Sequence, residues 1–315
     1  MTSRHRSPPR SESIDVLLGG LVDYAGLFPP ASESMRAAAE KYADYRDGAD
    51  QRALGRFIVP ASRLAELERE SADLMPRRKP SEPWRLSALI GGEPAAEMRA
   101  IVEFNQRHSA GSGNSLAAID VVEIKGGSAA DIAAHSRALP KSVVAYFEIP
   151  AGANPSQLIG AVAAAGARAK IRTGGVTADA FPSAEAIIAF IDACLRADVA
   201  FKATAGLHHP LRGEYRLTYE PGSATAMMYG YLNVFLATAL LRAGSSRDVA
   251  QAVLLETDPA SLDFEDDGIS WRGRKLTTPQ LLTSREFAIS FGSCSFREPI
   301  DELGQLTRTS RTGQL

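Results

Sequence analysis

Cysteine is scarce in this sequence. The 315 residues contain two, Cys194 and Cys294. Two cysteines are too few for a disulfide framework, and the absence of a CxxC pair excludes the ligand spacing of a zinc ribbon. A chain of this kind is typical of a reducing compartment, so we expect a cytoplasmic protein.

Long apolar runs and an excess of one charge are also missing. The longest apolar run, from Tyr229 to Leu241, is interrupted by Asn233 and Thr238 and falls short of the ~20 residues that a membrane span requires. The 35 Lys and Arg residues nearly balance the 37 Asp and Glu residues, which gives a net charge of −2. Partners such as nucleic acid or a membrane surface usually demand a net basic face. We therefore expect neither as a partner, whereas a homo-oligomer stays possible.

Two nucleotide-binding motifs are absent as well. The chain contains neither the GxGxxG fingerprint of dinucleotide-binding folds nor the GxxxxGK[ST] loop that cradles nucleotide phosphates. The sequence thus predicts no cofactor of these classes, and we expect the protein to work without a cofactor.

The chain does contain a regular alternation of short apolar or β-branched runs with longer helical stretches. Six runs are predicted to be strands: 55–60, 84–92, 117–127, 142–150, 167–175 and 199–210. The helices expected between them cover 62–75, 95–108, 128–139, 155–165 and 183–197. Alternating strands and helices, with strands that are apolar almost throughout, predict a parallel sheet covered by helices.

The ends of these strands favour a closed barrel. Strand after strand ends in polar or charged residues followed by Gly or Pro. A (β/α)8 barrel gathers all such ends at one mouth, whereas an open parallel α/β sheet gathers only those at its switch point. We therefore predict a (β/α)8 barrel over 55–306, with the open sheet as the alternative. The rest is predicted to be a disordered arm at 1–13, an N-terminal helical extension at 14–54 and a flexible tail at 307–315.

The last third of the predicted barrel is less regular. Helices are expected at 224–243, 246–256 and 278–288, and a hairpin insertion is expected around Asp267-Gly268. The segment 289–299 is expected to close the fold as a last strand.

Polar side chains share one face of four consecutive strands. Because side chains alternate along a strand, the apolar partners must face the helices and the polar set must point into the barrel. This set comprises Glu123, Lys125, Glu148, Lys170, Arg172, Lys202 and Thr204. With four cations to two carboxylates, the chamber is predicted to be net positive and to bind a small anionic metabolite.

Lys202 begins the sequence KATAGL at the end of the sixth predicted strand. This segment, Lys202–Leu207, resembles the Lys-Thr-Ser-Thr-Gly-Phe motif that carries the Schiff-base lysine on the sixth strand of the deoxyribose-phosphate aldolase type of class I aldolase. It departs from that motif at Ala203 and Ala205, where the family has hydroxyl residues. The resemblance implies carbon–carbon lyase or aldolase chemistry on a carbonyl-bearing substrate, with Lys202 as the nucleophile.

The neighbouring residues suggest supporting roles. We expect Lys170 and Arg172 to lower the pKa of Lys202 and to hold the substrate anion. Glu148 would act as general acid and base. A further set is expected to bind or orient the substrate, partly through backbone N–H groups of the glycine turn: Lys125, Glu123, Thr204, Gly174, Gly175, His208 and His209.

Two other functions remain open. His208 and His209, with Glu123 or Glu148, could bind a metal in a metal-dependent hydrolase or lyase. No metal is expected, however, because adjacent histidines lack the spacing of a helical ligand pair. The second alternative is a barrel without catalytic activity that binds an anion.

Overall fold

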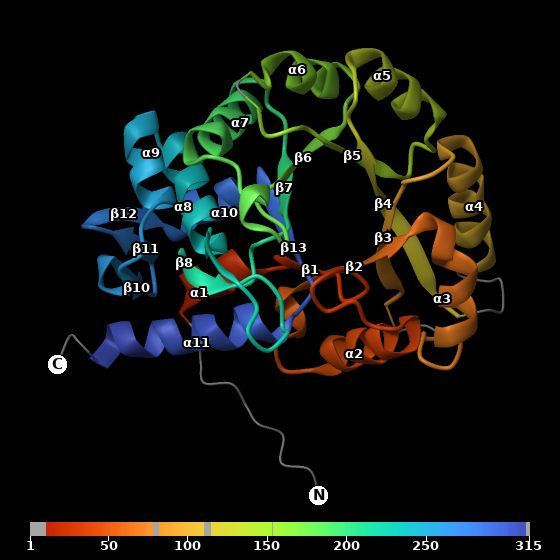
Figure 1. Cartoon of the computed structure of the whole chain (residues 1–315), viewed down its shortest axis with the longest axis horizontal. Helices are drawn as coiled ribbons and strands as arrows, with labels where there is room; N and C mark the ends of the chain where they lie inside the picture. The colour runs from red at the N-terminus through yellow and green to blue at the C-terminus, as the bar shows by residue number, and fades with distance from the viewer. Residues whose placement is uncertain (1–10, 78–81, 110–114, 153, 313–315) are drawn as a thin grey trace, which may run out of the picture.

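Eight parallel strands close into a barrel, which confirms the predicted (β/α)8 fold (Figure 1). The computed structural model describes residues 11–77, 82–109, 115–152 and 154–312. Around the barrel the strands follow the order β1-β13-β7-β6-β5-β4-β3-β2. Their bounds are β1 Val22–Tyr24, β2 Leu54–Pro60, β3 Trp84–Leu89, β4 Ala117–Lys125, β5 Val144–Glu148, β6 Arg168–Arg172, β7 Phe201–Thr204 and β13 Ala288–Ser293.

Helices surround the barrel because the strands bury apolar side chains on their outer face. On β4, for example, Val122 and Ile124 are buried in the core between the sheet and the helices, while Glu123 points into the barrel. Ser34, Ser128, Ser183 and Ser246 each cap a helix by accepting a backbone N–H in its first turn. The helices that follow the barrel strands in turn are α2 Met35–Asp47, α3 Leu64–Ser71, α4 Pro94–Arg107, α5 Ala129–Ala138, α6 Ser156–Ala164, α7 Ala184–Arg196, α8 Tyr231–Arg242 and α11 Arg297–Thr312.

The barrel begins earlier than the sequence predicted. The expected helical extension at 14–54 contains β1, which pairs with both β2 and β13 and is therefore a barrel strand. Helix α1 (Glu12–Leu18) precedes this strand, and Ser11 and Ser13 are buried, so the expected disordered arm at 1–13 is wrong at its end. Its first ten residues lie outside the described residues. A strand of three residues is too short to show the alternation on which the prediction relied.

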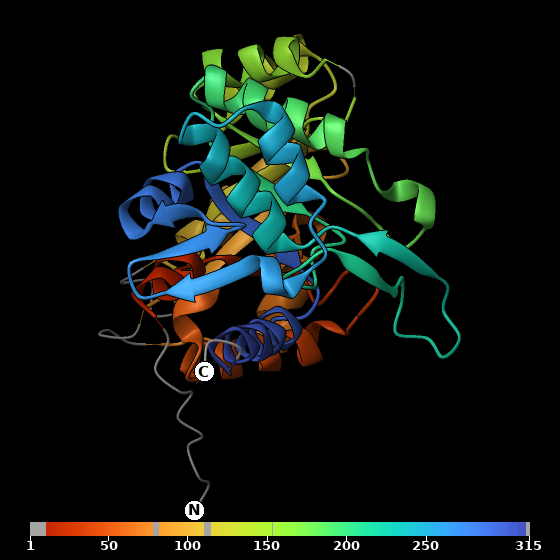
Figure 2. The same cartoon turned by 90° about the vertical axis from the view of Figure 1, so that its left-hand side faces the viewer.

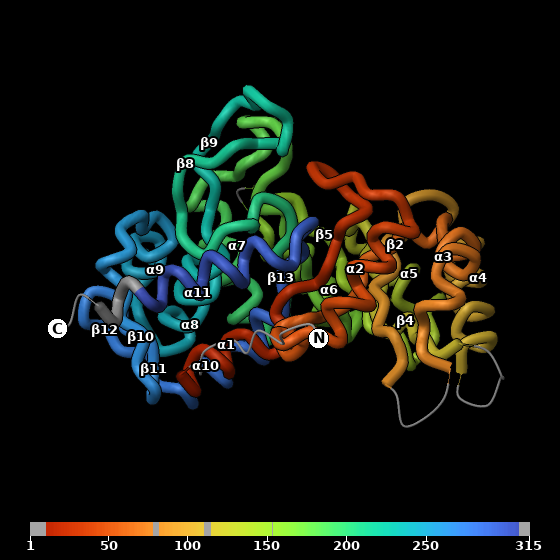
Figure 3. The backbone as a smooth tube through the Cα atoms, turned by 90° about the horizontal axis from the view of Figure 1, so that it is seen from below, coloured from red at the N-terminus to blue at the C-terminus, as the bar shows by residue number. Residues whose placement is uncertain are grey.

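The chain between β7 and β13 departs from the regular alternation of strands and helices. It contains a two-stranded ribbon, β8 (Gly213–Arg216) and β9 (Thr225–Met228), which projects on the same side of the molecule as the segment after β1 (Figure 3). The expected helix at 224–243 is thus wrong at its start, because 225–228 pair with β8 and α8 begins only at Tyr231. Helix α9 (Arg247–Leu254) packs beside α8 (Figure 2).

The expected hairpin is present within a three-stranded antiparallel sheet. Its strands are β10 (Leu262–Glu265), β11 (Gly268–Trp271) and β12 (Arg274–Thr277), and helix α10 (Thr278–Arg285) follows. Short 3-10 turns η1 to η4 cover Gln51–Ala53, Ala61–Arg63, Ala178–Ala180 and Pro259–Ser261.

The end of the chain is helical where a flexible tail was expected. Helix α11 continues to Thr312, well beyond the predicted start of the tail at 307. Within the described ranges, no helix combines the length and apolar character needed to cross a membrane.

Candidate active site

A cavity of about 230 Å³ lies at the carboxyl ends of the barrel strands. This is the face at which (β/α)8 enzymes place their active sites. One side of the cavity is polar and the other apolar. The lining residues are Ala25, Phe28, Pro29, Pro30, Ile58, Leu89, Glu123, Lys170, Arg172, Gly175, Val176, Thr204, Ala205, Gly206, His208, Gly292 and Cys294.

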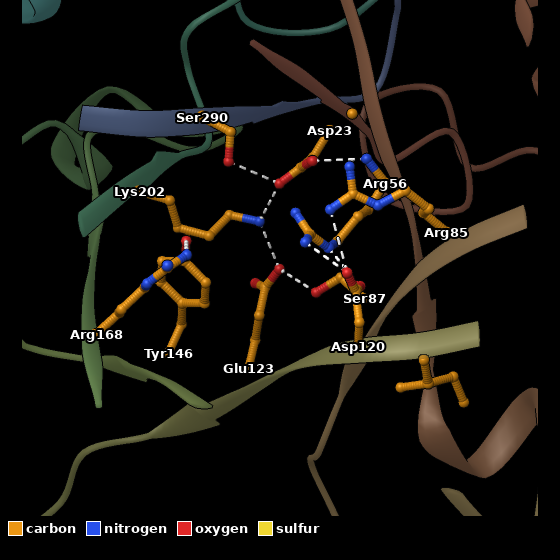
Figure 4. Close-up of polar contacts among 12 residues, drawn as sticks. Asp23, Arg56, Arg85, Ser87, Asp120, Glu123, Tyr146, Arg168, Lys202 and Ser290 are labelled. Carbon is orange, nitrogen blue, oxygen red and sulfur yellow. Dashed lines mark hydrogen bonds and ion pairs between the residues drawn. The ribbon is translucent and has the colours of Figure 1, made fainter. Parts of the chain in front are cut away.

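Lys202 lies at the centre of the barrel, below the cavity. Its Nζ is 2.6 Å from Asp23 Oδ2 and 2.7 Å from Glu123 Oε1 (Figure 4). Ser290 Oγ donates to Asp23 Oδ2, and Ser87 Oγ donates to Glu123 Oε1, each over 2.8 Å. The Lys202 side chain is 1 % exposed. The lysine is thus held by two carboxylates that are themselves fixed by hydroxyl groups.

Lys170 occupies the matching place on the neighbouring strand but reaches the cavity. Its Nζ is 2.8 Å from Glu123 Oε2 and 2.9 Å from Glu148 Oε2. Glu123 therefore bridges the two lysines, one through each carboxylate oxygen. Lys170 and Glu123 line the cavity, whereas Lys202 and Glu148 are not among its lining residues.

The charges around Lys202 differ from the sequence prediction. Burial favours the neutral amine, but the nearby carboxylates of Asp23 and Glu123 outweigh it and raise the pKa of Lys202. Burial likewise acts to raise the pKa of Glu123, but the charges of Lys170 and Lys202 outweigh it, so the pKa is held below its usual range. The expectation that cations lower the pKa of Lys202 is therefore wrong, because carboxylates surround its Nζ.

Asp23 is the central residue that the sequence analysis missed. It lies on β1, is 1 % exposed, and accepts the backbone N–H of Arg56 at 2.7 Å through Oδ1. A Cβ at Gly55 would lie 2.2 Å from this same oxygen. Only glycine at position 55 leaves room for the carboxylate.

Asp23 also changes the balance of charge. The buried cluster holds three carboxylates (Asp23, Glu123, Glu148) and two lysines, so the predicted excess of cations does not apply to the barrel interior. The positive charge lies higher, at the rim. Arg172 is exposed and lines the cavity, while Lys125 is exposed and is not among the lining residues.

The remaining predicted residues divide between the cavity and its supports. Thr204, Gly175 and His208 line the cavity. Gly174 is not among the lining residues: it lies against Phe181, where a Cβ would come within 2.5 Å of the ring.

The two adjacent histidines face different partners. Nδ1 of His208 lies 3.3 Å from Ser293 Oγ and 3.7 Å from Cys294 Sγ, and burial lowers its pKa to about 4. His209 stacks on Tyr215, and its Nδ1 lies 2.8 Å from a carboxylate oxygen of Glu302 on α11. The alternative metal set with Glu123 or Glu148 is not brought together among the described residues, where the histidines pair with carboxylates of α11.

The loop after β1 covers the apolar side of the cavity. Phe28, Pro29 and Pro30 line it together with Ile58 and Leu89 from the neighbouring strands. The loop therefore lies at the mouth of the barrel. Cys294 also lines the cavity, and burial raises the pKa of its thiol to about 11, so it is a neutral wall residue.

The addition of β1 also renumbers the barrel. Lys170 lies on the sixth barrel strand in chain order and Lys202 on the seventh, whereas the sequence analysis placed Lys202 on the sixth. A comparison with protein-family models finds no matching family, and a comparison with curated proteins finds no significant match.

Proposed function

We propose that this protein is a Schiff-base enzyme of the carbon–carbon lyase type that acts on a small, anionic, carbonyl-bearing metabolite. One observation carries the proposal: Lys170, the lysine among the residues lining the cavity, is held between two carboxylates at the mouth of the barrel. A lysine beside a proton acceptor is the arrangement that amine attack on a carbonyl requires.

Lys170 suits the nucleophilic role better than Lys202. Lys202 lies below the cavity, and its raised pKa favours the ammonium form. The aldolase family that KATAGL resembles carries its Schiff-base lysine on the sixth barrel strand, and the sixth strand here holds Lys170. Lys202 then serves as a positioning residue whose charge keeps Glu123 ionised beneath Lys170.

Glu148 supplies the proton transfers. Its carboxylate takes a proton from the Lys170 ammonium, and the neutral Nζ attacks the carbonyl carbon as the C=O electron pair moves to oxygen. A proton then shifts from nitrogen to oxygen, and Glu148 returns its proton to that hydroxyl. Water leaves, and an iminium ion remains. The side chain of Glu148 is 21 % exposed, so it can exchange protons with solvent afterwards.

The iminium ion accepts electrons from a neighbouring carbon–carbon bond. That bond breaks as the β-hydroxyl of the substrate gives its proton to the carboxylate of Glu148, which is ionised again at this stage, and becomes the carbonyl of the released aldehyde or ketone. The electron pair moves to nitrogen and leaves an enamine. Protonation of the enamine carbon followed by addition of water frees Lys170 and the second product, so no external oxidant or reductant is needed.

The polar rim provides the site for the substrate anion. Arg172 lines the cavity next to the turn at Gly175. It forms no ion pair with a carboxylate within the described ranges. A guanidinium beside such a turn suits a carboxylate or phosphate. On the opposite side, Phe28, Ile58 and Leu89 suit an apolar substituent, so the favoured substrate combines an anionic group with an apolar carbon chain or ring.

Borohydride trapping tests the proposal. The native protein is incubated with pyruvate or with an apolar 2-oxo acid such as phenylpyruvate, reduced, digested and mapped by mass spectrometry. We expect an adduct on the peptide that contains Lys170. Lys170→Arg should abolish it because guanidinium stays protonated, and Lys125→Arg, an exposed lysine at the end of β4, should leave it unchanged.

An adduct on Lys202 would refute the assignment of Lys170. Calorimetric binding of these acids without an adduct would instead favour the barrel that binds an anion without chemistry. Loss of turnover on treatment with a chelator, in the absence of any adduct, would favour the metal-dependent alternative.

A further inference from the structure

A second group of chemically capable side chains lies beside the cavity. His209, Glu298 and Glu302 each place one potential ligand atom within 4.8 Å of the others. His209 belongs to the segment after β7, while Glu298 and Glu302 lie one turn apart on α11. Residues separated by four positions share a helix face, so both carboxylates can approach the imidazole together.

In the described part of the chain, the two carboxylates pair with histidines rather than with lysine or arginine. Among the described residues, neither Glu298 nor Glu302 forms an ion pair with a lysine or arginine. The nearest arginine in the sequence, Arg297, pairs with Asp50 and Asp301 instead. Two half-buried carboxylates on one helix face repel each other, and a bound cation would remove that repulsion.

Neighbouring contacts hold the group in place. His209 stacks on the ring of Tyr215, with centroids 3.5 Å apart. Tyr219 donates to Glu298 Oε2 over 3.1 Å, and Nδ1 of His208 lies 3.7 Å from the same oxygen. Ligands fixed by surrounding contacts lose little freedom when a metal binds.

We propose that His209, Glu298 and Glu302 form a binding site for a divalent transition metal at the rim of the barrel mouth. One imidazole nitrogen and two carboxylates suit Zn²⁺, Co²⁺ or Mn²⁺ rather than a metal that requires thiolates. Three protein ligands leave a coordination position open. His208, which contacts Glu298 and lines the cavity, connects this site to the cavity wall. The site is separate from Lys170, so it does not depend on the Schiff-base proposal.

Cobalt binding tests the site. The full-length protein is freed of metal with a chelator and titrated with Co²⁺, and the visible absorption bands report the number and type of ligands. We expect saturable binding of one Co²⁺ per chain that Zn²⁺ displaces. Glu302→Gln and His209→Ala should each weaken binding at least tenfold.

The chain offers a matched control for Glu302→Gln. Glu68 also lies 2.9 Å from a histidine nitrogen, that of His108, but Arg107 already neutralises it. Glu68→Gln should therefore leave Co²⁺ binding unchanged. Wild-type protein without saturable binding, or a Glu302→Gln variant with wild-type affinity, would overturn the site. A circular dichroism spectrum and a thermal unfolding midpoint close to those of the wild type would confirm that the Glu302→Gln variant is folded.

Discussion

Lys202 at the centre of the barrel and Lys275 on the surface of the three-stranded sheet each lie between two carboxylates. Lys202 Nζ is 2.6 and 2.7 Å from Asp23 and Glu123, and Lys275 Nζ is 2.5 and 2.7 Å from Glu265 and Asp267. The distances are nearly the same, but the Lys202 side chain is 1 % exposed and that of Lys275 is 37 % exposed.

Burial gives the same contacts different consequences. At the surface, water and salt screen the attraction, and immobilising long side chains offsets most of what remains. In the barrel, each charge has lost its hydration and depends on its partners, so removal of one partner leaves another charge buried without compensation. The stability of the protein therefore depends on every member of the central cluster. It depends little on the surface triad of Lys275, Glu265 and Asp267.

The largest expected effect comes from removing the buried lysine. Lys202→Met should lower the free energy of unfolding by about 3–5 kcal/mol, because Asp23 and Glu123 would remain buried beside each other without their shared cation. Chemical denaturation measures this change. Lys275→Met is the control, and its unfolding midpoint should stay close to that of the wild type. Equal losses of unfolding free energy in the two variants would show that burial does not make the contacts of Lys202 more important than those of Lys275.

An intermediate effect is expected from pH. The folded-state pKa of Glu123 is held below the unfolded value of ~4.3, so its contribution is complete above that value and is lost as the pH falls through the folded pKa. The pKa of Lys202 is raised above ~10.4, so its contribution is complete below that value and is lost as the pH rises through the folded pKa. Stability should therefore be level from about pH 5 to pH 10 with respect to these two groups.

Urea denaturation at a series of acidic pH values checks the lower limit of that range. Glu123→Gln should flatten the acid-side loss of stability, whatever its effect at neutral pH. Glu265→Gln, which removes a surface carboxylate, should retain the slope of the wild type. An unchanged acid slope in Glu123→Gln would contradict the linkage.

The smallest expected effect is that of salt. Raising the ionic strength to ~1 M shortens the screening length to ~3 Å, which weakens the attractions of the surface triad and leaves the buried cluster almost unaffected. Any difference in unfolding midpoint between wild type and Lys275→Met should vanish at high salt, while that for Lys202→Met should persist. If the difference in unfolding midpoint between wild type and Lys202→Met shrinks with salt, water and ions must reach the buried cluster, which would contradict the comparison.

The strands that could be predicted were those with enough residues to show alternation. The runs that became β2 to β7 were identified, and with them Glu123, Glu148, Lys170 and Lys202, because an apolar neighbour fixed the outward face of each strand. Strand β1 has three residues, all buried, so no alternation marked Asp23 as facing inward. A buried carboxylate opposite a glycine on the next strand is visible only once the register is known.

Depth along the barrel could not be predicted either. Alternation assigns Lys125, Lys170, Arg172 and Lys202 to inward faces, but it does not show how far each lies from the mouth. Pairing places Arg172 two residues nearer the rim than Lys170, but it sets Lys170 level with Lys202 on the next strand. The two lysines differ in their side-chain positions, since Lys170 lines the cavity and Lys202 does not. For the same reason the sequence assigned the nucleophile to Lys202, whose side chain lies below the cavity. Glu302 escaped notice because it lies on α11, after the last barrel strand, where no strand alternation shows which side chains reach the mouth.

Closure of the barrel depends on the last strand to be synthesised. Strand β13 pairs with β7 on one side and with β1 on the other, and it brings Ser290 to Asp23. Until residues 288–293 leave the ribosome, β1 and β7 are open edges and the carboxylates and lysines between them stay hydrated. The loop-closure entropy and the dehydration of the pair between Asp23 and Lys202 are therefore both met only when this strand is added. The nascent chain must accordingly hold an open sheet of β1 to β7, with two unprotected edges, until β13 has been synthesised.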